Sequence, residues 1–171
     1  MAWTAPRTWA LNDLVTPALL NEQLRDNLLA LRTPPTCRAT QTTATSLANA
    51  TYTAVTFNAE AWDTDAIHST TTNTERLNPS TAGKYLVVAN VGLSGAANLT
   101  LAARLFKNTT AIAYQAQTTT PSVSPDGIVI QTIIDMNGTT DYLTVEVYQN
   151  SGAARNTNTG ITFFSCVWVA P

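Results

Sequence analysis

The sequence contains 171 residues, of which 44% are hydrophobic and only 12% are charged. This amount of apolar side chain suffices for one compact domain with an appendage, so we do not expect global disorder. The formal net charge of −2 gives no basic patch, and no run of about 20 apolar residues occurs, so we expect no nucleic-acid partner and no membrane partner.

Residues 1–16 form the first predicted element, an extended arm whose apolar side chains follow neither a helical nor a strand period. Trp3 and Trp9 are its strongest candidate anchors, because an indole ring buries a large area at a modest entropic cost. We expect the arm to dock on a partner molecule, and the alternative is that both tryptophans fold back on the chain's own head. The predicted docking residues are Trp3, Pro6, Trp9, Leu11 and Leu14.

A short α-helix is predicted over residues 17–33. Thr16 supplies an N-cap hydroxyl and Pro17 occupies the first helical position, whereas Pro34 and Pro35 stop the helix. Such a short helix is marginal alone and needs a partner surface. We expect three copies of it to cluster at the foot of a homotrimer; the alternative is a helix packed on its own head. The predicted trimerisation residues are Leu20, Leu24, Leu28, Leu31 and Trp168.

Residues 34–49 are predicted to be a linker, and residues 50–171 to be an all-β head. Apolar and polar residues alternate there in short stretches, and turn residues separate the stretches, as in a β-sandwich. The fold class predicted is therefore mainly β, a single jelly-roll sandwich preceded by the arm and the helix. The principal predicted strands cover 52–58, 84–91, 99–107, 110–117, 127–135, 141–149 and 159–169.

Part of the head resembles a known superfamily. Phe57-Asn58, Asp65 and the stretch from Leu77 to Tyr85 (LNPSTAGKY) are similar to the pattern of complement-type globular heads and their tumour necrosis factor relatives. Leu101–Asn108 and Thr162–Val169 resemble a hairpin and the closing strand of that superfamily, although Asn108-Thr109 and Ser165-Cys166 replace its usual glycines. The resemblance implies a jelly roll that trimerises about an axis lined by aromatic and aliphatic side chains.

The N-terminal region has a second resemblance. Trp3–Trp9 (WTAPRTW) followed by Leu14–Leu28 (LVTPALLNEQLRDNL) is similar to the start of many virion proteins of tailed bacteriophages. This resemblance implies a non-enzymatic capsid decoration or head-fibre protein, located in the virion, whose partner is the major capsid protein or another virion protein. The alternative function is the tip of a tail fibre or spike that binds a receptor or a host surface glycan.

Few residues in the head point to chemistry. Glu60, Asp63, Asp65 and His68 lie within nine residues and carry donors that metals accept, but the loop lacks the glycine and the full ligand set of a calcium site. We expect neither a bound metal nor a cofactor, and no catalytic residues. Trp62 and Tyr114 are candidates for stacking on a sugar ring. The candidate ligand loop comprises Trp62, Asp63, Asp65 and His68.

The two cysteines, Cys37 and Cys166, lack the spacing of a CxxC motif and lie near opposite ends of the sequence. No basic start followed by an apolar stretch marks a signal peptide. We therefore expect buried free thiols and synthesis in the cytoplasm of the host.

Overall fold

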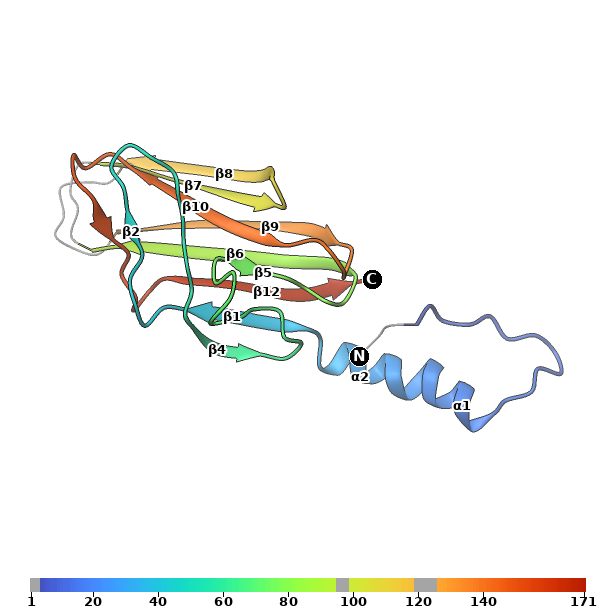
Figure 1. Ribbon diagram of the computed structural model, residues 1–171. Coiled ribbons are helices and arrows are strands. Elements are labelled where there is room, and N and C mark those ends of the chain that lie inside the picture. The colour runs from blue at the N-terminus through green and yellow to red at the C-terminus, as the bar shows by residue number, and fades with distance from the viewer. Residues whose placement is uncertain (1–3, 95–98, 119–125) are drawn as a thin grey trace.

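The computed structural model describes residues 4–94, 99–118 and 126–171, and shows two antiparallel β-sheets packed face to face, with a helical stalk at one end (Figure 1). The predicted fold class, a mainly β sandwich with one short helix, is confirmed. Within the described residues, no helix is long and apolar enough to cross a membrane.

The first sheet contains five strands in the order β4-β1-β12-β6-β9. Every pairing in it is antiparallel, and β6 lies between β12 and β9. Its strands are β1 (Thr36–Thr40), β4 (Ala59–Asp63), β6 (Gly83–Leu93), β9 (Asp126–Met136) and β12 (Phe163–Ala170).

The second sheet has the order β3-β10-β7-β8, and β5 pairs with β10 beyond the end of β3. Its strands are β3 (Thr53–Ala54), β5 (Arg76–Leu77), β7 (Thr100–Lys107), β8 (Thr110–Thr118) and β10 (Leu143–Gln149). A separate two-stranded sheet joins β2 (Ser46–Leu47) to β11 (Arg155–Asn156) at the end of the head opposite the stalk (Figure 1).

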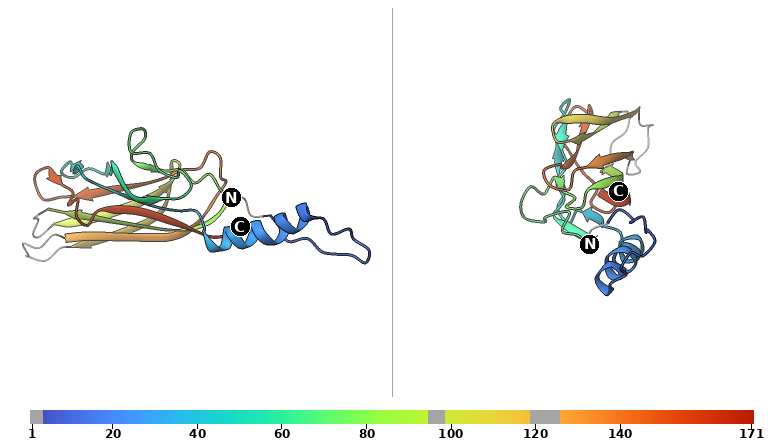
Figure 2. Two further views of the ribbon diagram at one scale, coloured as in Figure 1. Left: turned by 90° about the horizontal axis from the view of Figure 1, so that it is seen from below. Right: turned by 90° about the vertical axis from the view of Figure 1, so that its right-hand side faces the viewer.

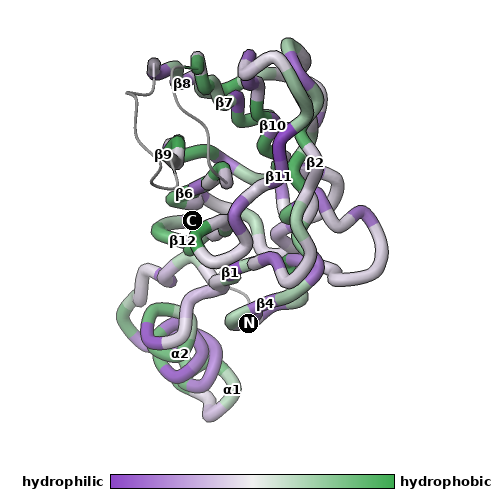
Figure 3. Tube along the Cα trace, turned by 90° about the vertical axis from the view of Figure 1, so that its left-hand side faces the viewer, coloured by the Kyte–Doolittle hydropathy of each residue, from purple (hydrophilic) through white to green (hydrophobic). Residues whose placement is uncertain are grey.

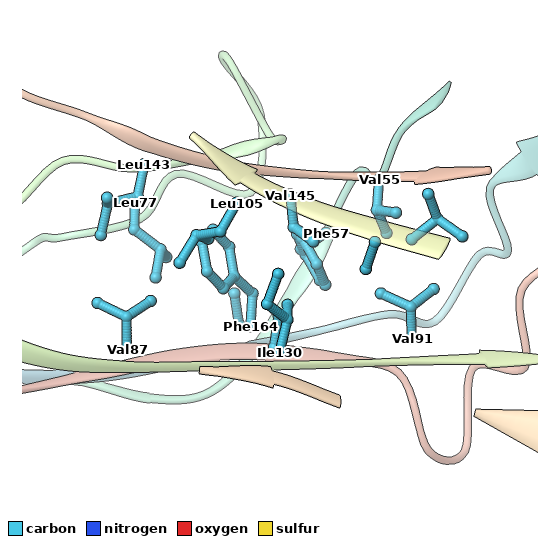
Figure 4. Close-up of a cluster of buried hydrophobic side chains, with 14 of the residues drawn as sticks. Val55, Phe57, Leu77, Val87, Val91, Leu105, Ile130, Leu143, Val145 and Phe164 are labelled. Atoms are coloured by element: carbon cyan, nitrogen blue, oxygen red, sulfur yellow. The ribbon is translucent and has the colours of Figure 1, made fainter. Parts of the chain in front are cut away.

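The core lies between the two sheets and follows from the period-2 alternation of their strands. On β10, Leu143, Val145 and Val147 are fully buried, whereas the residues between them are partly exposed. Figure 4 shows side chains of both sheets meeting in this layer, with Phe57 and Phe164 near its centre. The two phenyl rings lie 5.7 Å apart between centroids and stack at a tilt.

The stalk helix comprises α1 (Pro17–Leu20), a π-helical stretch η1 (Asn21–Asp26) and α2 (Asn27–Arg32). The hydroxyl of Thr16 accepts a hydrogen bond from Leu19 N at 3.2 Å, so the predicted N-cap is present. The helix ends at Arg32, before Thr33. It projects from the end of the sandwich and does not pack along either sheet (Figure 2).

The predicted linker over residues 34–49 needs correction, because β1 and β2 lie within it. β1 pairs with β12 and β4, and it buries the small side chains of Cys37 and Ala39. The inward-facing residues of β1 are small and few, so the alternation that would predict a strand is weak in the sequence, and Pro34 and Pro35 just before it indicate a loop. The predicted strand over 52–58 also shortens to β3, although Val55 and Phe57 after it still point into the core.

Candidate functional site

The N-terminal arm runs back along the stalk helix (Figures 1 and 2). The amide of Asn27 is buried and binds both backbone groups of Thr4: its Oδ1 accepts from Thr4 N, and its Nδ2 donates to Thr4 O, each at 3.0 Å. Nearer the tip of the stalk, Gln23 Oε1 accepts from Arg7 N at 2.7 Å. The described arm and the helix therefore form one unit that projects from the head.

A bend at the tip of the stalk has its own contacts. The Arg7 guanidinium lies 3.0 Å from Asp13 Oδ2 and 4.9 Å from the centroid of the Trp9 ring. A hydrogen bond from Ala10 N and the nearby Arg7 hold the pKa of Asp13 below its usual value. The ring of Trp9 thus stays on the arm and does not fold back on the head.

The predicted docking residues that the structure describes lie on the arm and are accessible there. Leu11 is 93% exposed, Leu14 78% and Trp9 43%, and Pro6 is also exposed. Trp3 lies outside the described residues. Large apolar side chains left in solvent on one segment are typical of a surface that a partner covers.

The four predicted leucines of the stalk lie on one side of the helix, since residues four and three apart share a face. Each of them is 43% to 64% exposed. The arm contacts a neighbouring side of the helix, where Asn27 and Ala30 are buried. We call the exposed set the leucine face: Leu20, Leu24, Leu28 and Leu31.

A second apolar surface lies on the outer side of the first sheet. On β6, Tyr85 and Val87 point into the core, so Leu86 and Val88 point outward and are only partly buried. Leu86 is opposite Ile133 of β9 on one side and opposite Val167 of β12 on the other. We call this set the sheet face: Leu86, Val88, Val129, Ile133 and Val167.

The sheet face is absent from the predicted site residues, although the sequence contains a signal for it. The stretch KYLVVANV over 84–91 is apolar on both faces, as is typical of a strand covered on both sides. In the single chain the core covers only one side, and Ile133 remains 60% exposed on the other. Colouring by hydropathy shows apolar segments in β9, β6 and β12 (Figure 3).

Trp168 does not belong with the leucines of the stalk. Its ring is 4% exposed within the core, and its Nε1 donates to Ala82 O at 3.0 Å. A side chain buried in this way offers almost no surface to a second copy. Its predicted trimerisation role is therefore corrected to a core role, which fits its inward place on β12.

The candidate ligand loop is held together by its own hydrogen bonds. The Asp63 carboxylate accepts from the backbone N–H groups of Asp65, Ile67 and His68 at 2.8–3.1 Å. Asp65 Oδ2 accepts from the hydroxyls of Ser80 and Thr81. These carboxylates thus shape the loop itself.

His68 is buried in the same loop and joins two of its segments. Its Nδ1 lies 2.9 Å from Glu60 Oε1. Its Nε2 lies 3.2 Å from the carbonyl oxygen of Thr74, which can only accept a hydrogen bond. Trp62 is 48% exposed, and its Nε1 donates to Thr36 Oγ1 at 3.3 Å. No group of three or more metal-binding side chains occurs among the residues that the structure describes.

Cys37 and Cys166 face each other across β1 and β12 and are both buried free thiols. Burial raises the pKa of the Cys166 thiol to about 12, and it also raises the pKa of Cys37, to which the negative charge of Asp63 adds. A thiol that keeps its proton is a poor nucleophile, so we assign this pair a packing role in the core.

The sandwich matches solved structures of the tumour necrosis factor-like jelly-roll class. Murine APRIL, crystallised at pH 5.0, superposes with a TM-score of 0.61 at 13% identity, over 80% of this chain and all of that chain. The Eiger TNF from S. frugiperda superposes with a TM-score of 0.56 at 16% identity, over 81% of this chain and 94% of that chain. At these identities the likeness shows the fold alone.

The fold is thus a tumour necrosis factor-like jelly roll, as the head motifs implied. No known family model matches the sequence, and a search of curated proteins found no significant match.

Proposed function

We propose that this protein is a non-enzymatic structural component of a bacteriophage virion, a trimeric capsid decoration or head-fibre protein that docks by its N-terminal arm. The observation that carries the proposal is the leucine face, which is exposed on a helix projecting away from the head. The resemblance of residues 3–28 to the starts of phage virion proteins supports the assignment to a virion.

Association of three copies is supported by two exposed apolar surfaces. A short isolated helix is marginally stable, and a cluster of three stalks would bury the leucine face of each. The sheet face would supply a second contact within the head, because the sequence of β6 is typical of a strand covered on both sides. The leucine face belongs to the stalk and the sheet face to the head, so together they would hold three copies in contact at both ends.

Docking would stabilise a shell in two ways. Each arm presents a small apolar contact, and three arms on one trimer raise the effective concentration of each after the first binds. A protein that binds only the assembled shell then shifts the equilibrium toward that shell by mass action. The sparse charge of the chain suits a protein that spends its working life within an assembly.

The test is the mass in solution of the full chain and of a version lacking residues 1–16, measured by light scattering. We expect trimers from both, and we expect only the full chain to bind virions prepared without this protein. A monomer in both preparations would overturn the trimer. Equal binding of the shortened chain to virions would overturn the role of the arm.

A further inference from the structure

The outer side of the second sheet contains a groove of about 350 Å³. This volume lies within the range of about 300–1,000 Å³ that is usual for small-molecule sites. Thr144 and Glu146 lie in its floor, since they alternate with the buried residues of β10. The other residues used below are Glu75, Arg76, Phe106 and Thr109.

Arg76 presents a positioned set of donors at this groove. Its guanidinium lies 4.2 Å from the centroid of the Tyr142 ring, and its Nε donates to Glu75 Oε1 at 3.0 Å. Within the described part of the chain, no hydrogen bond uses its two terminal nitrogens. Because the stacking and the ion pair fix the side chain, those nitrogens can bind a ligand with little loss of side-chain entropy.

Acceptors and hydroxyls lie beside these donors. Glu146 Oε2 accepts from Arg104 Nη2 at 2.7 Å, and the Arg104 guanidinium lies 3.5 Å from the centroid of the Tyr52 ring. The second oxygen of Glu146 makes no hydrogen bond with the described residues, and neither do the hydroxyls of Thr109 and Thr144. The groove thus offers positioned donors on Arg76, a positioned acceptor on Glu146, and two hydroxyls without a hydrogen bond to the described residues.

Aromatic rings complete the surface. Phe106 lies directly opposite Thr144 across β7 and β10, within the groove. Beside it, the rings of Tyr52 and Tyr148 lie 5.3 Å apart between centroids, and Tyr114, opposite Arg104, is 63% exposed. Rings of this kind provide flat apolar surface next to polar atoms.

The charges at the groove cancel, because Arg76 pairs with Glu75 and Arg104 pairs with Glu146. An anion would meet two carboxylates, and a cation would meet two guanidinium groups. A neutral ligand with many hydroxyls avoids both conflicts. A pyranose ring has this chemistry, since each hydroxyl both donates and accepts and the C–H face of the ring packs on aromatic side chains.

We propose that this groove binds a neutral saccharide through Arg76, Glu146 and Thr144, with Phe106 as the apolar floor. All of these residues belong to one protomer, so binding requires neither the trimer nor the virion location. Sugar recognition would thus lie on the second sheet and not at Trp62 or His68, neither of which lines the groove.

The test is binding of the full chain to an array of neutral, sialylated and sulfated oligosaccharides, followed by calorimetric titration of the strongest neutral ligand. The variant is Arg76→Ala. The matched control is Arg155→Ala, which removes an arginine whose Nε also bonds to a near neighbour, Ser151, outside the groove. Glu146→Gln is a second variant that keeps the shape of the side chain.

We expect a neutral ligand that binds at least tenfold more weakly to Arg76→Ala and Glu146→Gln, and within twofold of the original protein to Arg155→Ala. No binding to any neutral saccharide, binding confined to the acidic ones, or equal affinity in Arg76→Ala would each overturn the proposal. Light scattering and thermal melting on the same samples report trimer formation and folding separately, so failure of one proposal is distinguishable from failure of the other.

Discussion

At the scale of single residues, Gly83 lies where the end of β12 packs too closely for any side chain. Its φ is +133°, and a Cβ built there would lie 2.4 Å from both Ala170 O and Trp168 Nε1. Gly152 also has a positive φ, of +88°, but nothing lies within 4 Å of its Cβ position. The two glycines therefore separate the effect of backbone strain from that of lost space.

We expect Gly83→Ala to lower the free energy of unfolding by about 3–5 kcal/mol, because strain and a forced shift of Trp168 act together. Gly152→Ala should cost about 1–2 kcal/mol from strain alone. Urea unfolding of the two variants measures both values. Equal losses would contradict the view that Gly83 is required by close packing against Trp168.

The buried thiols predict how stability depends on pH. Unfolded cysteines lose their protons above a pKa of about 8.5, whereas the folded chain keeps them because burial raises the pKa of both thiols. The unfolded state then binds fewer protons, so the free energy of unfolding falls as pH rises above about 8.5. Raising the pH from 8 to 10 should cost about 2 kcal/mol for each such thiol.

Cys166→Ala tests this dependence. The variant is expected to be less stable at pH 8 because it leaves a cavity, but to lose about 2 kcal/mol less than the original protein between pH 8 and 10. Ser165→Ala, a change on the same strand that removes no titrating group, should keep the full loss. An undiminished loss in Cys166→Ala, measured by urea unfolding at both pH values, would argue against the raised pKa.

At the scale of elements, the arm is tied to the stalk helix chiefly by Asn27. Replacing Asn27 by Ala removes both hydrogen bonds to Thr4, so the arm should detach from the helix more often. We expect trypsin to cleave after Arg7 about 5- to 150-fold faster in this variant, since two hydrogen bonds contribute about 1–3 kcal/mol.

The control for this experiment is Asn21→Ala, which changes an exposed asparagine of the same helix. Its cleavage rate after Arg7 should equal that of the original protein. If the two variants were cleaved equally fast, the contact between Asn27 and Thr4 would not be what holds the arm.

The elements also show what the sequence could reveal. The long strands β6, β7, β8, β9, β10 and β12 were predictable because each is a stretch of seven residues or more, apolar or alternating, with turn residues at its ends. The two-residue strands β2, β3, β5 and β11 are too short to carry a period, and only pairing with distant segments defines them. The predicted helix ends within a residue of the observed one, since Thr16 caps its start and Pro34 and Pro35 stop it.

The candidate sites divide in the same way. The leucine face was predictable, because its members repeat along one helix. The sheet face was predictable only in part, since the apolar stretch 84–91 marks β6, but β9 and β12 are distant in the sequence. The groove was not predictable, because Arg76 and Thr144 are partners only through the pairing of β5 with β10. A single sequence contains no local signal for that pairing.

At the scale of the whole molecule, the sheet face predicts how assembly responds to a buried charge. Ile133→Lys places an ammonium group at the proposed contact, which costs the trimer at least the lost burial of about 1.5–3 kcal/mol at each of three positions. We expect a shift from trimer to monomer in light scattering, and a melting temperature that no longer rises with protein concentration.

Tyr114→Lys is the matched control, because it charges an exposed aromatic position on the other sheet. It should leave the mass in solution unchanged. A trimer that survives Ile133→Lys would place the contact between copies elsewhere on the head.

The connection of the stalk to the head has a mechanical consequence. The stalk helix leads directly into β1, which is paired on both sides, with β4 and with β12, and which continues roughly in line with the helix (Figure 1). Tension on the stalk would therefore load the hydrogen bonds of both ladders together, in shear, because these bonds run perpendicular to the strands. Bonds that share a load must break together, so the head should resist being pulled from its anchor far better than a strand peeled from a sheet edge.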